Sequence, residues 1–312
     1  MRHRLTTRLI LVAMALAGTI VSSGCARTRP EAKAATGASA SPAAAAGSVR
    51  PDSSSTLALA PDLTTNPALL ASAINPALPS IFVAGDSTAA RGNGTNQQGW
   101  AVPFADYFDP AKVNVVNRAR GGRSSRTFIT EGLWDQLLAN VKRGDIVLIQ
   151  FGHNDAGAIN DTSRARGSLP GLGEETQEID NLLTKKHEVV HTFGWYLRKM
   201  IADTKAKGAT PIVCSLIPRK IWKEGKIARS KDSYAGWAEQ VAKAEGVAFV
   251  DLNEIIAQRY DELGPEKVNP LFGDEHTHTS AAGAELNAQC VIAGLKALQD
   301  DPLAPYLREE KP

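Results

Sequence analysis

The stretch Ser80-Ile81-Phe82-Val83-Ala84-Gly85-Asp86-Ser87-Thr88 decides the fold of this chain. Its β-branched and aromatic apolar run predicts a buried strand, which the glycine and the polar residues after it end in a tight turn. A serine at the carboxyl end of a parallel strand lies where open α/β sheets place their chemistry. Ser87 is therefore a candidate nucleophile, and helix capping by Ser87 or Thr88 is the alternative interpretation.

The bulk composition is that of a globular protein. The chain has 312 residues, of which 43% are hydrophobic and 22% charged, so it has enough apolar material for a large core. Its formal net charge is only +2, and no run of lysine or arginine marks a binding face. We therefore expect neither nucleic acid nor an anionic membrane surface as a partner.

The N-terminus has the pattern of an export signal, which we assign to residues 1–25. Three arginines precede an apolar run over 9–21, and small residues follow immediately before Cys25. A cysteine in that position resembles a bacterial lipobox, which makes Cys25 a candidate lipid anchor, whereas 15–17 offers a conventional cleavage site. The protein is expected to be exported, as a periplasmic or cell-surface lipoprotein or in secreted form.

Residues 26–77 consist mainly of alanine, serine, proline, threonine and glycine, a composition that predicts a disordered tether. The folded domain is then expected over 78–300, with a C-terminal tail over 301–312. Inside that domain, short apolar runs alternate with segments of helical period. Strands are expected at 81–84, 113–117, 145–151, 211–217 and 247–252, and helices at 100–108, 133–142, 193–207, 234–244 and 281–298.

This alternation predicts a parallel sheet covered by helices on both faces, a three-layer α/β/α sandwich. The stretch 157–186 is polar and glycine-rich with little periodicity, which indicates a long insertion after a strand. Such insertions often line sites. Cys214 and Cys290 lie in apolar runs and are expected to be small buried hydrophobic residues, with a disulfide between them left open.

Three further polar segments follow or precede predicted elements. Consecutive glycines at 121 and 122 allow a loop to point a backbone N–H at a ligand, although a plain turn explains them equally well. Asn154 follows the strand at 145–151, and its amide is a suitable oxyanion donor, with turn formation as the alternative. A carboxylate three residues before a histidine can fix the imidazole tautomer, as Glu275 can for His278.

Together these segments resemble the SGNH (GDSL-like) hydrolase superfamily. Their amino-acid sequences further resemble those of the rhamnogalacturonan acetylesterases, a family of carbohydrate esterases. The similar stretches are GDSTAA (85–90), GWAVPFADYF (99–108), NRARGGRSSRTF (117–128), GLW (132–134), IQFGHND (149–155) and HTHTSAAGAELNA (276–288). The resemblance implies a flavodoxin-like, five-stranded parallel sheet.

It also implies that Ser87 is the nucleophile and His278 the general base. The Ser87 and Gly122 backbone N–H groups and the Asn154 side chain would be the oxyanion donors. The spacing favours Glu275 as the acid, and Asp274 is the alternative if the loop differs by one residue. His276 is a rival base, but it lacks a carboxylate three positions before it.

The implied activity is removal of O-acetyl groups from plant cell-wall polysaccharide through an acyl-enzyme, without metal or cofactor. Acetylated rhamnogalacturonan of pectin is the expected substrate, xylan or another acetylated sugar the runner-up, and a monomer the expected state. Trp222 and Arg219, in the polar stretch after a predicted strand, are candidate sugar-binding residues.

Two other functions compete with this interpretation. His187-Glu188-Val189-Val190-His191 matches the H-E-x-x-H helix motif of zinc peptidases, although two lysines precede it and no third-ligand pattern follows. A polar segment at the start of a helix is the alternative explanation of this match. The second competing function is a non-catalytic carbohydrate-binding lipoprotein that stacks sugars on tryptophans 100, 134, 222 and 237, of which at least two are expected in the core.

Overall fold

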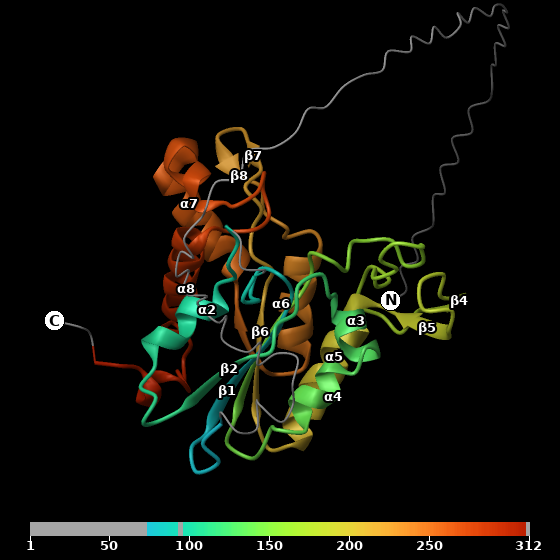
Figure 1. Ribbon diagram of the computed structural model, residues 1–312, viewed down its shortest axis with the longest axis horizontal. Coiled ribbons are helices and arrows are strands. Elements are labelled where there is room, and N and C mark those ends of the chain that lie inside the picture. The colour runs from blue at the N-terminus through green and yellow to red at the C-terminus, as the bar shows by residue number, and fades with distance from the viewer. Residues whose placement is uncertain (1–73, 93–95, 310–312) are drawn as a thin grey trace, which may run out of the picture. The chain divides into compact units, whose positions relative to one another are not determined.

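The computed structural model describes residues 74–92 and 96–309 (Figure 1). The segments expected as export signal and tether up to residue 73, with Cys25, lie outside these residues. Five strands form the central sheet: β1 (Ser80–Gly85), β2 (Asn114–Asn117), β3 (Ile146–Gln150), β6 (Thr210–Cys214) and β9 (Ala248–Val250). The main helices are α2 (Ala101–Phe104), α3 (Ser125–Thr130), α4 (Leu133–Leu138), α5 (Phe193–Ala206), α6 (Tyr234–Ala244), α7 (Leu252–Val268) and α8 (Ala281–Lys296).

All neighbouring strands of the sheet run parallel, in the order β2-β1-β3-β6-β9. Phe82 of β1 stands between Val116 of β2 and Val147 of β3 in the register. The chain leaves β1 toward one edge of the sheet and then returns to build the other edge from β3. Because the winding reverses there, the carboxyl ends of β1 and β3 flank a crevice where such sheets bind ligands.

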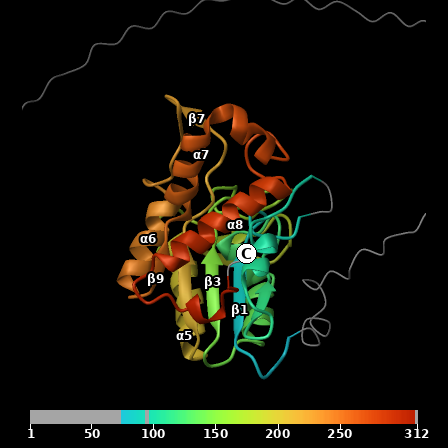
Figure 2. The ribbon, with the colours of Figure 1, turned by 90° about the vertical axis from the view of Figure 1, so that its left-hand side faces the viewer.

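Helices cover both faces of the sheet, and the alternation of side chains along β1 divides the core between them. Ile81 and Val83 pack on one face, in the cluster that holds Trp100, the residue before α2, and residues of α7 and α8. Phe82 and Ala84 face the other layer, built from α3, α4, α5 and α6. Figure 2 shows α8 lying across the sheet on the first face. The predicted three-layer α/β/α sandwich with a flavodoxin-like parallel sheet is confirmed.

Every strand predicted for the sheet is present, with ends that differ by a few residues. The helix predicted over 100–108 is shorter, since α2 gives way to a tight 3₁₀ turn at Ala105–Tyr107. Two helices, α3 and α7, were not predicted. Helix α3 has only six residues, of which two neighbours, Phe128 and Ile129, are apolar, so it shows no helical period. Helix α7 is interrupted at Gly264, which has a positive φ of 76°.

The insertion over 157–186 contains structure that its composition did not predict. It leads into an antiparallel hairpin of β4 (Thr176–Asp180) and β5 (His187–His191), which lies outside the main sheet. A second small hairpin pairs β7 (Trp222–Lys223) with β8 (Lys226–Ile227). Both hairpins follow the carboxyl end of a sheet strand, on the side of the sheet where the site is expected.

Cys214 and Cys290 are both buried with free thiols, so the open question of a disulfide between them is settled against it. In the predicted C-terminal tail, Leu303 is buried and Leu307 pairs with Phe108 next to α2. None of the helices in the described parts of the chain has the length and apolar character needed to cross a membrane.

Candidate active site

Buried polar groups form hydrogen bonds that stabilise the turn after β1. Asp86 is fully buried, and its Oδ1 accepts hydrogen bonds from the Thr88 backbone N–H at 2.9 Å and the Thr88 hydroxyl at 2.7 Å. The amide of Gln150, at the end of β3, donates to Asp86 Oδ2 at 3.4 Å. These bonds fix Asp86 and Thr88, the two neighbours of Ser87, and so hold Ser87 at the switch point of the sheet.

The loop before α8 is organised by one carboxylate. Oδ1 of Asp274 accepts the backbone N–H groups of His276, Thr277 and His278 at 3.1, 2.7 and 2.9 Å. The Gly273 N–H donates to the His278 carbonyl at 2.8 Å and closes the loop. A Cβ at Gly273 would lie 1.8 Å from the Asn96 carbonyl oxygen, so only glycine fits there.

These two segments meet in a hydrogen-bonded relay. His278 Nε2 lies 2.9 Å from Ser87 Oγ, and His278 Nδ1 lies 2.5 Å from Asp274 Oδ2. Burial alone would raise the pKa of Asp274, but the backbone N–H groups of His278 and Thr277 and the imidazole outweigh it and lower the pKa to about 2. Asp274 is thus a stable anion beside the imidazole, the arrangement that holds a general base in its reactive tautomer.

The preferred assignment of Glu275 as the partner of His278 is wrong in this geometry. The Glu275 side chain is 94% exposed, and its carboxylate lies 3.8 Å from the ring of His276 instead. Asp274, four residues before His278, is the partner because its shorter side chain folds back under the loop and reaches the imidazole. His276 contacts Arg219 Nη1 at 3.4 Å through Nε2, whereas the ring that contacts Ser87 is that of His278.

The three expected oxyanion donors lie around Ser87. Gly122 has a φ of +79°, a conformation that favours glycine, and it lines the same cavity as Ser87 and Asn154. The Asn154 amide donates to the Arg123 carbonyl at 2.9 Å, which fixes its orientation and leaves a second N–H. Within the described residues, the backbone N–H groups of Ser87 and Gly122 donate to no other protein group.

A cavity of about 540 Å³ opens in front of the relay. Its wall contains Ser87, Gly121, Gly122, Arg123, Thr127, Glu131, His153, Asn154, Ser163, Arg164, Arg166, Leu183, Arg219, Thr277 and His278. Arg219 therefore lies where a substrate residue was expected. Trp222 does not line this cavity: it stands in β7 and packs against the core cluster around α7 and α8. The Trp222 side chain is partly buried there, away from the cavity lining.

The tryptophans expected as alternative sugar platforms also serve the core. Trp100 and Trp134 are fully buried, and the indole N–H of Trp100 donates to the Gln150 side chain at 3.0 Å. Trp237 packs against the cluster on the face covered by α5 and α6.

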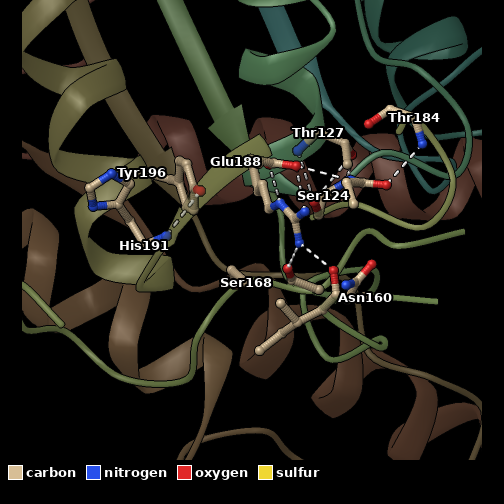
Figure 3. Close-up of polar contacts among 12 residues, drawn as sticks. Ser124, Thr127, Asn160, Ser168, Thr184, Glu188, His191 and Tyr196 are labelled. Carbon is tan, nitrogen blue, oxygen red and sulfur yellow. Dashed lines mark hydrogen bonds and ion pairs between the residues drawn. The ribbon is translucent and has the colours of Figure 1, made fainter. Parts of the chain in front are cut away.

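The H-E-x-x-H match lies on strand β5 and on no helix, so the zinc-peptidase interpretation and the expected helix start are both wrong. Alternation along a strand points Glu188 to the face opposite His187 and His191. Glu188 forms an ion pair with the buried Arg126, with Nε to Oε1 at 2.6 Å, and His191 stacks on Trp195. Figure 3 shows Glu188 and His191 on separate sides of the strand. No cluster with metal-ligand composition occurs in the described residues.

Several residues of the cavity wall were not predicted. Arg164 and Arg166 belong to the insertion, and His153 lies three residues after the end of β3. His153 is buried, and desolvation lowers the pKa of its ring. The alternation of arginine with small residues in Ser163-Arg164-Ala165-Arg166-Gly167 was the available signal, but nothing in the sequence placed that segment against Ser87.

A serine, a histidine and a carboxylate linked above the switch point of a parallel α/β sheet define the class of serine hydrolases. Residues 83–286 match the GDSL-like Lipase/Acylhydrolase family, and the chain belongs to that family. It is a carboxylic ester hydrolase.

The chain is also similar in sequence to named esterases. The chain is 33% identical over 214 residues to the rhamnogalacturonan acetylesterase of Emericella nidulans, a match that covers 68% of this chain and 83% of the relative. It is 31% identical to the probable rhamnogalacturonan acetylesterase YesY of Bacillus subtilis, covering 70% and 93% of the two chains. The crystal structure of YxiM from Bacillus subtilis superposes with a TM-score of 0.57 at 26% identity, over 72% of this chain and 57% of that one.

Proposed function

We propose that this protein is a serine esterase that removes O-acetyl groups from acetylated rhamnogalacturonan. The observation that carries the proposal is the continuous relay from Ser87 Oγ through His278 to Asp274, with bonds of 2.9 and 2.5 Å. The Emericella relative, named a rhamnogalacturonan acetylesterase, and the Bacillus relative YesY, named a probable one, support the substrate.

In the first half of the reaction, His278 Nε2 takes the Ser87 hydroxyl proton as Oγ attacks the acetyl carbonyl carbon. The carbonyl π bond becomes a negatively charged oxygen, which the Ser87 and Gly122 N–H groups and the Asn154 amide stabilise. Asp274 stabilises the imidazolium that forms. The tetrahedral intermediate then collapses, the sugar oxygen leaves with the proton from His278, and the acetyl group remains on Ser87.

In the second half, water replaces the sugar. His278 takes a proton from water as its oxygen attacks the acetyl-enzyme, and the same three donors stabilise the second oxyanion. Collapse releases acetate and returns the proton to Ser87 Oγ. Every proton is carried by this chain's own imidazole, so the proposed cycle needs no cofactor.

Arg219, on the wall of the same cavity, is proposed to bind the polysaccharide. The positively charged start, the apolar run over 9–21 and the small residues before Cys25 support export, with Cys25 as a proposed lipid anchor. We further propose that the enzyme is exported and monomeric, and that it meets its polymer outside the cytoplasm.

The test is acetate release from acetylated rhamnogalacturonan and from acetylated xylan. Wild-type protein is compared with Ser87→Ala and with Ser233→Ala, a serine at the start of α6 that does not line the cavity. We expect release from the pectic polymer that is lost only in Ser87→Ala and is unchanged by a chelator. Release from xylan alone would keep the chemistry and change the substrate. Activity that survives Ser87→Ala would refute the proposal.

A further inference from the structure

The cavity in front of Ser87 is unusually rich in arginine. Four guanidinium side chains lie on its wall, from Arg123, Arg164, Arg166 and Arg219. The acidic side chain on that wall, Glu131, already pairs with Arg123 at 2.8 Å. Among residues 74–92 and 96–309, no carboxylate lies within ion-pair distance of the other three guanidinium groups. The cavity therefore carries uncompensated positive charge beside the nucleophile.

Arg166 is the most constrained of these side chains. Its Nη1 donates to the Gly122 carbonyl at 3.2 Å, which places the guanidinium next to a proposed oxyanion donor. Burial lowers the pKa of Arg166, and the neighbouring charge of Arg164 lowers it further. A half-buried cation without an ionic partner has a desolvation cost that a bound anion would offset.

The segment that carries Arg164 and Arg166 is held in place from several sides. Oδ1 of Asp161 accepts the backbone N–H groups of residues 163, 164 and 165 at 2.9, 2.6 and 2.8 Å. Ala165, between the two arginines, has a φ of +39° with its methyl group buried. The arginines are thus positioned before a ligand arrives, which lowers the entropic cost of binding.

The same segment is anchored to the protein body at its two ends. Buried Arg126 donates through Nη1 to the carbonyls of Ile159 and Gly167, at 2.8 and 2.6 Å, while its other nitrogens bind Glu188 of β5. The Ser168 hydroxyl donates to Asp155 at 3.1 Å. Figure 3 shows Glu188 of β5 near Ser168 and Asn160, which lie beside the two ends of this segment.

Arg219 reaches the cavity from the loop after β6, and it also has no anionic partner in the described part of the chain. Its Nε lies 3.4 Å from His153 Nδ1 and its Nη1 lies 3.4 Å from His276 Nε2. Burial lowers the pKa of His153, and Arg219 contributes to that shift. Two imidazoles hold the guanidinium without neutralising it.

We propose that Arg166, assisted by Arg164 and Arg219, binds the carboxylate of a uronic acid residue adjoining the acetylated sugar. The inference deepens the proposed function and rests on it. A planar guanidinium binds a carboxylate through two parallel hydrogen bonds, which selects an acidic over a neutral polysaccharide and fixes its register at Ser87. Arg166 is in this sense a specificity-determining residue.

The experiment compares two forms of one substrate: acetylated rhamnogalacturonan oligosaccharides, native and with the uronate carboxyls reduced to primary alcohols, at matched acetyl content. kcat and KM for acetate release are measured for wild type, Arg166→Gln and Arg164→Gln. Arg259→Gln is the matched control, because Arg259 is an exposed arginine on α7 that pairs with Glu262 and does not line the cavity.

Wild type should prefer the native substrate by about tenfold or more in kcat/KM, mainly through KM, as is typical for loss of one desolvated charge contact. The preference should fall to within about threefold of unity in Arg166→Gln, fall partly in Arg164→Gln and persist in Arg259→Gln. Exposed Arg164 gives the test a second variant if Arg166→Gln does not fold. Equal wild-type rates on both substrates, or an unchanged preference in both cavity variants, would overturn the inference.

The two proposals fail in different ways. Equal release of acetate from native and carboxyl-reduced oligosaccharides leaves the esterase and its substrate standing and removes only the carboxylate subsite. No release from either form by active wild-type protein removes the rhamnogalacturonan assignment itself.

Discussion

Replacing Asp274 by asparagine tests whether Asp274 or Glu275 is the carboxylate that acts with His278. Asparagine keeps an oxygen at Oδ1, which can still accept the three backbone N–H groups of the loop, so the fold of the loop should survive. The second atom changes from an anionic acceptor to an NH₂ donor. It then faces His278 Nδ1 over the 2.5 Å contact and forces the imidazole proton onto Nε2.

An imidazole protonated at Nε2 cannot take the proton of Ser87, and it has also lost the anion that stabilises its charged form. The drop of the Asp274 pKa from 3.8 to about 2 corresponds to about 2 kcal/mol in favour of the ionised carboxylate. Loss of the tautomer together with this stabilisation predicts a fall in kcat of about 10⁴-fold, or about 5.5 kcal/mol, as measured for equivalent changes in other serine hydrolases.

The assay is hydrolysis of p-nitrophenyl acetate at pH 7, with unfolding in urea to verify that each variant is folded. Glu275→Gln is the matched control, since this exposed side chain does not contact His278. Its kcat should stay within about twofold of wild type, as expected for an exposed surface change. A loss below tenfold in folded Asp274→Asn, or an equal loss in Glu275→Gln, would refute the assignment of the acid.

Three further predictions concern the scaffold. Glu188→Ala leaves the buried guanidinium of Arg126 without its ion pair and should lower the free energy of unfolding, measured in urea, by about 3 kcal/mol. A change below about 0.5 kcal/mol would contradict this. Burial raises the pKa of Asp155 from 3.8 to about 6, so wild type should lose about 3 kcal/mol of stability relative to Asp155→Asn as the pH rises from below 4 to above 6, and a pH-independent difference would refute the shift. Burial raises the thiol pKa of Cys214 to about 12 and of Cys290 to about 11, so both should resist iodoacetamide at pH 8 until the protein is denatured, as read from peptide masses.

The sheet could be predicted because its strands are short, fully apolar runs that end in glycine or polar residues. Along β1 and β3 every residue is buried, so composition alone marks the strand. Ser87 and His278 were likewise visible, since each occupies a distinctive motif at the end or start of an element. The structure adds that the two side chains lie within hydrogen-bond distance.

The remaining features depend on contacts that sequence spacing does not carry. The choice between Asp274 and Glu275 is decided by how the loop curls around its own N–H groups, and a spacing of three residues suggested the wrong one. The sequence of strand β5 matches the H-E-x-x-H motif, which other proteins carry on a helix, but pairing with β4 and the ion pair with buried Arg126 hold it extended. The arginines of the insertion approach Ser87 only through long-range packing.

The loop from Gly273 to His278 holds both the acid, Asp274, and the base, His278, within a segment of six residues. Since Asp274 binds the backbone of His278 as well as its ring, any displacement of the loop moves acid and base as a single rigid piece. The distance left free to vary is the one between that piece and Ser87, which comes from the other end of the domain. The bond between the imidazole and its carboxylate is thereby held within one loop, whereas the bond between the imidazole and the nucleophile joins two segments 191 residues apart in the sequence.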